Sequence, residues 1–132
     1  MLIIICKALH TETDQSCLIY KDDKGIVRLL KFNKNISSDN KKLDILGRLN
    51  ELKVTNEYTN VNYKHFKGGK YRSLVNAFDF NGNEFMIYQN IDPDQKDKYM
   101  KIYARPIEMF KSLVDKEKYP NVKQKYRFEK ES

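Results

Sequence analysis

The stretch from Tyr63 to Phe110 constrains the fold of this chain more than any other part of the sequence. Two turn signals interrupt it, Gly68-Gly69 and Asn81-Gly82-Asn83, and the segments around them are rich in β-branched and aromatic residues. Glycine adopts positive φ without strain, and asparagine–glycine pairs are typical of tight hairpin turns. The pattern therefore predicts two consecutive hairpins, with strands at 63–66, 70–78 and 84–89.

The rest of the second half predicts one more strand, a short helix and a docked tail. Residues 99–104 alternate enough to form a strand, and Arg105 is biased to extended geometry because a proline follows it. Pro106 suits the first position of a helix whose apolar face would be formed by Ile107, Phe110, Leu113 and Val114. The segment 126–128 has enough aromatic character to dock on the sheet.

The first half predicts a three-stranded β-meander over residues 1–36. A continuous apolar run at 2–8 suits a buried strand, and two more β segments follow at 17–20 and 26–32 around an Asp-Asp-Lys-Gly turn. Leucines then recur every third residue, which predicts a linking helix at about 39–53 within the connecting segment 37–56. The expected fold class is therefore mostly β (α+β).

Size and charge narrow the class of protein. The chain has 132 residues, 40% of them hydrophobic, so it can bury the core of one domain or of two small units. A net charge of +7 favours an anionic partner such as nucleic acid, a nucleotide or an acidic protein surface. The two cysteines, Cys6 and Cys17, are expected to be buried thiols, and no apolar run is long enough to span a bilayer. A cytoplasmic protein without a membrane partner is expected.

Three motifs in the second half resemble one known family. They are Tyr63-Lys64-His65-Phe66-Lys67-Gly68-Gly69-Lys70-Tyr71, Ile87-Tyr88 and Ala104-Arg105-Pro106-Ile107-Glu108-Met109-Phe110. Over roughly residues 60–130 the chain resembles the bacterial domain of unknown function 1653. That family is similar to a small SH3-type β-roll, so the resemblance implies an SH3-like β-barrel within residues 57–132 and implies no activity. Tyr103 stands where the family commonly has Trp, and Asp79-Phe80-Asn81-Gly82 replaces its usual Ser-Glu-Thr hairpin.

A weaker similarity relates the two halves of the chain to each other. It pairs Ala8 with Ala77, Ile19-Tyr20 with Ile87-Tyr88, Arg28 with Arg105, and Phe32 with Phe110. This order predicts a degenerate internal repeat whose first copy lacks the strand of the glycine turn. Chance alignment of β-branched hairpins is the alternative.

The glycine turn carries the first candidate ligand site. Lys64, Lys67, Lys70 and Arg72 surround it without an intervening acid, and aromatic residues alternate with them. The adjacent N–H groups of Gly68-Gly69 could form an anion nest, and basic groups beside aromatics suit phosphate and base contacts. The alternative is a solvated lysine edge that discourages strand pairing.

Arg105 is the second candidate, because the following proline would present its planar guanidinium rigidly to a phosphate or carboxylate. The alternative is a structural arginine that pairs with Glu108 or bonds neighbouring carbonyls. The full set of predicted ligand-binding residues is Lys64, His65, Lys67, Lys70, Arg72, Tyr103 and Arg105.

The sequence predicts no catalytic or metal site and no cofactor. Cys6, His10, Glu12, Asp14 and Cys17 lack the spacing of metal ligands, and no serine lies in a nucleophile motif. We therefore expect a non-catalytic binding module for a phosphate-bearing ligand, either nucleic acid or a nucleotide. The alternatives are a sponge for a small signalling nucleotide, as an accessory or phage-borne protein, and a protein-interaction adaptor. A pocket lined by Tyr, His and Arg would favour the nucleotide, and a ridge of lysines the polymer.

Overall fold

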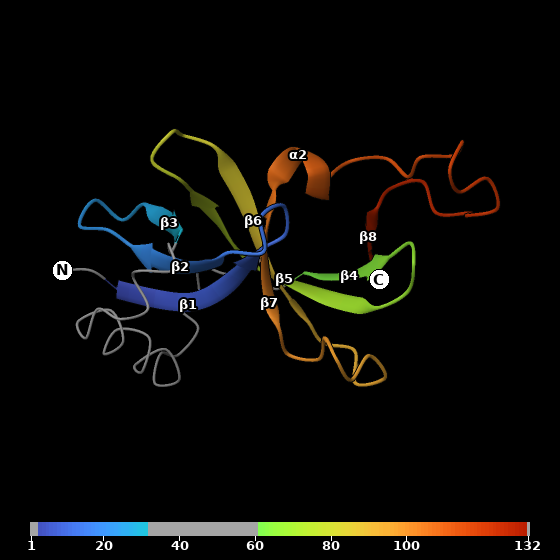
Figure 1. Ribbon diagram of the computed structural model, residues 1–132, viewed down its shortest axis with the longest axis horizontal. Helices are drawn as coiled ribbons and strands as arrows, with labels where there is room; N and C mark the ends of the chain where they lie inside the picture. Colours follow the sequence, from blue (N-terminus) through green and yellow to red (C-terminus); the bar gives the residue numbers. More distant parts are fainter. Residues whose placement is uncertain (1–2, 32–60, 132) are drawn as a thin grey trace.

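Eight strands and one short helix make up the computed structural model, which describes residues 3–31 and 61–131 (Figure 1). The strands are β1 (Ile3–His10), β2 (Ser16–Lys21), β3 (Val27–Lys31), β4 (Asn62–His65), β5 (Lys70–Phe78), β6 (Glu84–Asn90), β7 (Ile102–Pro106) and β8 (Phe128–Lys130), and the helix is α2 (Ile107–Phe110). The mostly-β prediction is confirmed. The predicted linking helix lies outside the described residues.

All eight strands belong to one closed sheet, in the order β3-β2-β1-β7-β6-β5-β4-β8. The sheet closes because β3 also pairs with β5, where Arg28 lies opposite Phe78. This pair and the pair β1–β7, where Leu9 lies opposite Tyr103, are parallel, and all the other pairs are antiparallel. The predicted meander β1–β2–β3 is therefore confirmed, and it closes the sheet together with strands of the second half.

The meander β1–β2–β3 and the meander β5–β6–β7 have the same strand register. Ile19 lies opposite Cys6 in the first, and Ile87 lies opposite Val75 in the second. In both, the register shifts at the residue just before this pair, so β1 and β5 carry an irregularity at the same place. The register thus makes Ile19 equivalent to Ile87, as the sequence similarity predicts.

The third strands of the two meanders correct one part of that similarity. Leu29 lies opposite Ile19 as Ala104 lies opposite Ile87, so Arg28 is equivalent to Tyr103. The predicted equivalence of Arg28 with Arg105 is wrong by two residues. Matching like residues gave this shift, because a displacement of two residues keeps the same side chains on each face and so does not disturb the alternation in the sequence. Phe32, predicted to match Phe110, lies outside the described residues.

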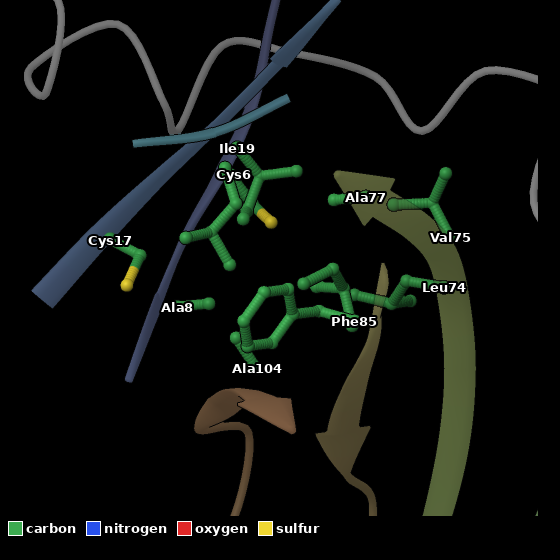
Figure 2. Close-up of a cluster of buried hydrophobic side chains, with 11 residues drawn as sticks. Cys6, Ala8, Cys17, Ile19, Leu74, Val75, Ala77, Phe85 and Ala104 are labelled. Atoms are coloured by element: carbon green, nitrogen blue, oxygen red, sulfur yellow. The ribbon is translucent and has the colours of Figure 1, made fainter. Parts of the chain in front are cut away.

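The main core lies between the two meanders and draws on both. Figure 2 shows Phe85 at its centre, between Ala8 of β1 and Leu74 of β5. Both predicted thiols are free and buried in this core. Burial raises the pKa of Cys6 to about 12 and that of Cys17 to about 11, so both remain protonated and serve as packing groups.

A second cluster, the aromatic cluster, lies under α2 and β8. Its buried members are Tyr71, Met86, Tyr88, Phe110 and Phe128. Phe128 enters it because β8 pairs with β4, where Phe128 lies opposite His65. The predicted docking of the tail is confirmed.

Three predicted boundaries after β6 are wrong: the start of the strand, and the start and the end of the helix. The strand predicted at 99–104 begins only at Ile102, because Met100 adopts a left-handed φ of 69° in the preceding turn. The helix ends at Phe110 instead of continuing to Val114, and Pro106 is the last residue of β7. Val114 N–H donates to the Lys125 carbonyl at 2.8 Å, so backbone pairing with the tail replaces a further helical turn. No helix in the described ranges is long and apolar enough to cross a membrane.

Candidate functional site

A cleft of about 620 Å³ lies beside Arg105, at the end of the sheet where β7 meets β1. Its walls come from β4 and its glycine turn, from β7, from the turn after β1, and from the loop between α2 and β8. That loop lies on the same side of the molecule as β4 in Figure 1. Of the described residues, five with cationic side chains line the cleft, namely Lys67, Lys98, Arg105, Lys118 and Arg127, together with the two carboxylates Asp14 and Asp115.

Arg105 is oriented by two neighbours in the aromatic cluster. Its Nε–H donates to the hydroxyl of Tyr88 at 3.0 Å, and its guanidinium carbon lies 5.9 Å from the centroid of the Phe128 ring. Among the described residues no carboxylate forms an ion pair with Arg105, so the predicted alternative partner Glu108 does not neutralise it. One edge of the guanidinium is thus used for positioning, and no acid in residues 3–31 or 61–131 forms an ion pair with it.

Arg127 is a second arginine of the cleft, and the sequence prediction missed it. The backbone fixes its position, because its N–H donates to the Ser112 carbonyl at 2.9 Å and its carbonyl accepts from Phe66 N–H at 3.0 Å. Its Nε is buried and, within the described part of the chain, has no hydrogen-bond partner. The available signal was its place between two aromatic residues in a segment expected to dock.

His65 sits in the positive field of these side chains. Its Nδ1 accepts the backbone N–H of Lys67 at 3.1 Å, so the neutral ring carries its proton on Nε2 and can donate there. Its pKa is lowered to about 4, first by burial and then by the charges of Arg105, Arg127, Lys67 and Lys98. His65 is therefore a neutral donor at physiological pH.

We expect the lowered pKa of His65 to make folding pH-dependent. The histidine of the unfolded chain takes up its proton near pH 6.5, and that of the folded protein only near pH 4. The free energy of unfolding is therefore at its full value above pH 6.5 and decreases as the pH falls toward 4. Allowing for partial solvent screening, the loss should be about 1–2 kcal/mol. Urea unfolding of wild type and His65→Gln between pH 4 and 7 separates the contribution of His65 from that of the carboxylates, because the carboxylates titrate in both proteins. Equal pH slopes for the two proteins would contradict it.

An aromatic pair forms the outer wall of the cleft. Tyr119 packs edge-on against Phe66 with ring centroids 5.0 Å apart, and the Lys67 ammonium lies 5.1 Å from the Tyr119 centroid. Hydrogen bonding from Lys67 is the main cause of a lowered pKa of the Tyr119 hydroxyl. Ring faces beside lysines can contact a nucleobase or a sugar phosphate.

The structure separates the seven predicted residues into two groups. His65, Lys67, Tyr103 and Arg105 line the cleft, whereas Lys64, Lys70 and Arg72 do not. Successive side chains of a strand point to opposite faces, and His65 and Tyr71 are the residues of β4 and β5 that face the cleft. Lys64 and Lys70 are exposed on the other face, and Arg72 there donates to Gln89 Oε1 at 3.2 Å.

The predicted anion nest is not available in full. Gly68 and Gly69 adopt φ values of +96° and +97°, but Gly68 N–H donates to the His65 carbonyl at 2.9 Å. At Gly69 a Cβ would lie 2.5 Å from Gln95 Oε1. Both glycines are therefore favoured by the positive φ of the turn, and Gly69 also lies against the Gln95 side chain.

Comparison with known proteins identifies one family. The family model described as "Protein of unknown function (DUF1653)" matches residues 61–130. No curated protein and no solved structure matches the chain. Of the described cleft residues, the matched region contains all except Leu9 of β1 and Thr11 and Asp14 of the turn after it.

Proposed function

This chain belongs to the DUF1653 family, and we propose that it binds a nucleotide without catalysis, holding the phosphate in the cleft beside Arg105. One observation carries the proposal: two arginines and a neutral histidine donor line a concave site in which no acid of the described residues forms an ion pair with Arg105. Guanidinium forks and N–H donors are the groups that bind phosphate oxygens best. The surrounding aromatic rings supply faces for a base.

The shape of the site favours a small ligand over a polymer. A volume of about 620 Å³ lies within the usual range for small-molecule pockets. The lysines that would extend a basic ridge along β4 and β5, Lys64 and Lys70, are on the opposite face from the cleft residues. Sequestration of a small signalling nucleotide, as a sponge would do, uses the same cleft and is included in the proposal.

The test is calorimetric titration with nucleoside mono-, di- and triphosphates, alongside 20-nucleotide single strands of DNA and RNA. At least one nucleotide is expected to bind more tightly than either strand. Tighter binding of a strand, with affinity falling at a log–log salt slope near −3 or steeper from about four phosphate contacts, would assign a polymer instead. Absence of binding to all of these ligands at low salt would refute the proposal.

Two lysines of the same hairpin form a matched pair for this test. Lys67→Gln removes a charge from the cleft and is expected to weaken nucleotide binding about 3–10-fold. Lys64→Gln removes the same charge from the other face and should change affinity less than about twofold. Equal effects of the two substitutions would mean that only the overall charge of the protein matters.

A further inference from the structure

We propose that the turn after β1, through Thr11 and Asp14, binds the vicinal hydroxyl groups of a ribose, so that the cleft selects ribonucleotides. The inference rests on the proposed function, because it concerns the opposite end of the same ligand. It assigns a role to the first half of the chain, which lies outside the region that the family model matches.

The turn is held against the strand that carries Arg105. Thr11 N–H donates to the Ala104 carbonyl at 3.0 Å, and His10 lies opposite Ala104 in the parallel pair β1–β7. Asp14 N–H donates to the His10 carbonyl at 2.9 Å, which closes the turn. Thr11 and Asp14 thus have fixed backbone positions beside the residue that precedes Arg105, and both line the cleft.

The Thr11 side chain has a hydrogen-bonding group without a protein partner. Its Oγ1 is buried and, among residues 3–31 and 61–131, makes no hydrogen bond. A buried hydroxyl without a partner is costly unless a ligand or water satisfies it. Thr11 lines the cleft, so a rotation of its side chain about the Cα–Cβ bond would present this hydroxyl to a ligand there.

The two carboxylates of the cleft differ in their availability. Asp115 Oδ1 accepts the backbone N–H groups of Glu117 at 3.0 Å and Lys118 at 3.3 Å, so Asp115 stabilises its own turn. The Asp14 carboxylate is exposed and accepts no hydrogen bond from any described residue. Among the described acids of the cleft, Asp14 is therefore the one with both carboxylate oxygens available to a ligand, whereas Asp115 has only its Oδ2.

These charges favour one orientation of a nucleotide in the cleft. A phosphate is attracted to Arg105 and Arg127 and repelled by the Asp14 carboxylate. A carboxylate is what binds ribose hydroxyls in dinucleotide-binding folds, because its two oxygens accept from neighbouring O–H donors. A nucleotide therefore fits with its phosphate at the arginines and its sugar at the turn.

The test compares ADP, GDP, CDP and UDP with their 2′-deoxy counterparts by calorimetry. Wild type is expected to bind the ribonucleotides about tenfold more tightly, which is the gain in affinity that one hydrogen bond to a charged group provides. Asp14→Asn and Thr11→Val should each reduce this ratio to below about threefold, while Thr11→Ser, which keeps the hydroxyl, should retain it. Because the two affinities in each ratio are measured on the same protein, a change in its net charge affects both alike. Thermal melts establish that each variant is folded.

Glu12→Gln is the matched control, because Glu12 belongs to the same turn and carries the same charge but does not line the cleft. It should leave the ratio at its wild-type value. Equal affinity of wild type for ribo- and deoxynucleotides would overturn the inference while leaving the proposed function intact. A second result would also overturn it: wild type prefers ADP, GDP and CDP, whose bases carry amino groups, over UDP, and Asp14→Asn removes this preference, while no variant distinguishes ribose from deoxyribose. Asp14 would then bind the base instead of the sugar. If no nucleotide binds, the proposed function itself fails, and the inference with it.

Discussion

Arg105→Ala is expected to weaken nucleotide binding by at least about 100-fold, because in the proposed complex it would remove a charged group that contacts the phosphate directly. Arg105→Lys keeps the charge but loses the planar fork, and a loss of about tenfold is expected. Stability should change little. The Tyr88 hydroxyl that accepts from Arg105 Nε belongs to a residue lining the cleft, so water can replace the lost donor at a cost of about 1 kcal/mol.

Tyr88→Phe provides the control for this prediction. It removes the acceptor that orients Arg105 but keeps the ring in the aromatic cluster, so a loss of only a few-fold in affinity is expected. Calorimetric titration and urea unfolding of all three variants separate binding from folding. A destabilisation above about 3 kcal/mol by Arg105→Ala, with nucleotide affinity unchanged, would show that Arg105 is a structural residue.

The hairpins could be predicted from the sequence because turn chemistry is local. Gly68-Gly69 and Asn81-Gly82-Asn83 both lie in the turns that their residue types indicate, and the strands on either side follow. Closure of the sheet could not be predicted in this way. It depends on Arg28 meeting Phe78 and Leu9 meeting Tyr103, which are separated in the sequence by 50 residues or more.

The candidate site shows the same division between local and long-range information. Arg105 and His65 were found because each lies in a distinctive local motif. Arg127 and Lys118 come from the loop between α2 and β8, whose position depends on the docking of β8 on β4, and Lys98 comes from the long loop between β6 and β7. The basic turn also misled the sequence prediction, because a cluster of lysines in the sequence does not state which face of the hairpin each one occupies.

Phe128→Ala should be strongly destabilising, since the ring joins the tail to the aromatic cluster. Phe128 is 6% exposed, and its ring stacks on Phe110 with centroids 4.3 Å apart and an interplanar angle of 13°. It also meets the rings of His65, Tyr71 and Tyr88 within 5.6 Å. Loss of a buried phenyl ring of this kind costs about 3–5 kcal/mol, which urea unfolding followed by circular dichroism will measure.

Two controls set the scale of this effect. Phe128→Leu keeps most of the apolar volume and should cost less than half as much, and Phe80→Ala, at a ring that is 71% exposed, should cost no more than about 0.5 kcal/mol. A cost below about 1 kcal/mol for Phe128→Ala would mean that the tail is not docked in solution. Because β8 also holds Arg127 beside Phe66, the docked tail is part of the cleft. Phe128→Ala should therefore lower nucleotide affinity even under conditions in which the variant is fully folded, whereas Phe80→Ala should not.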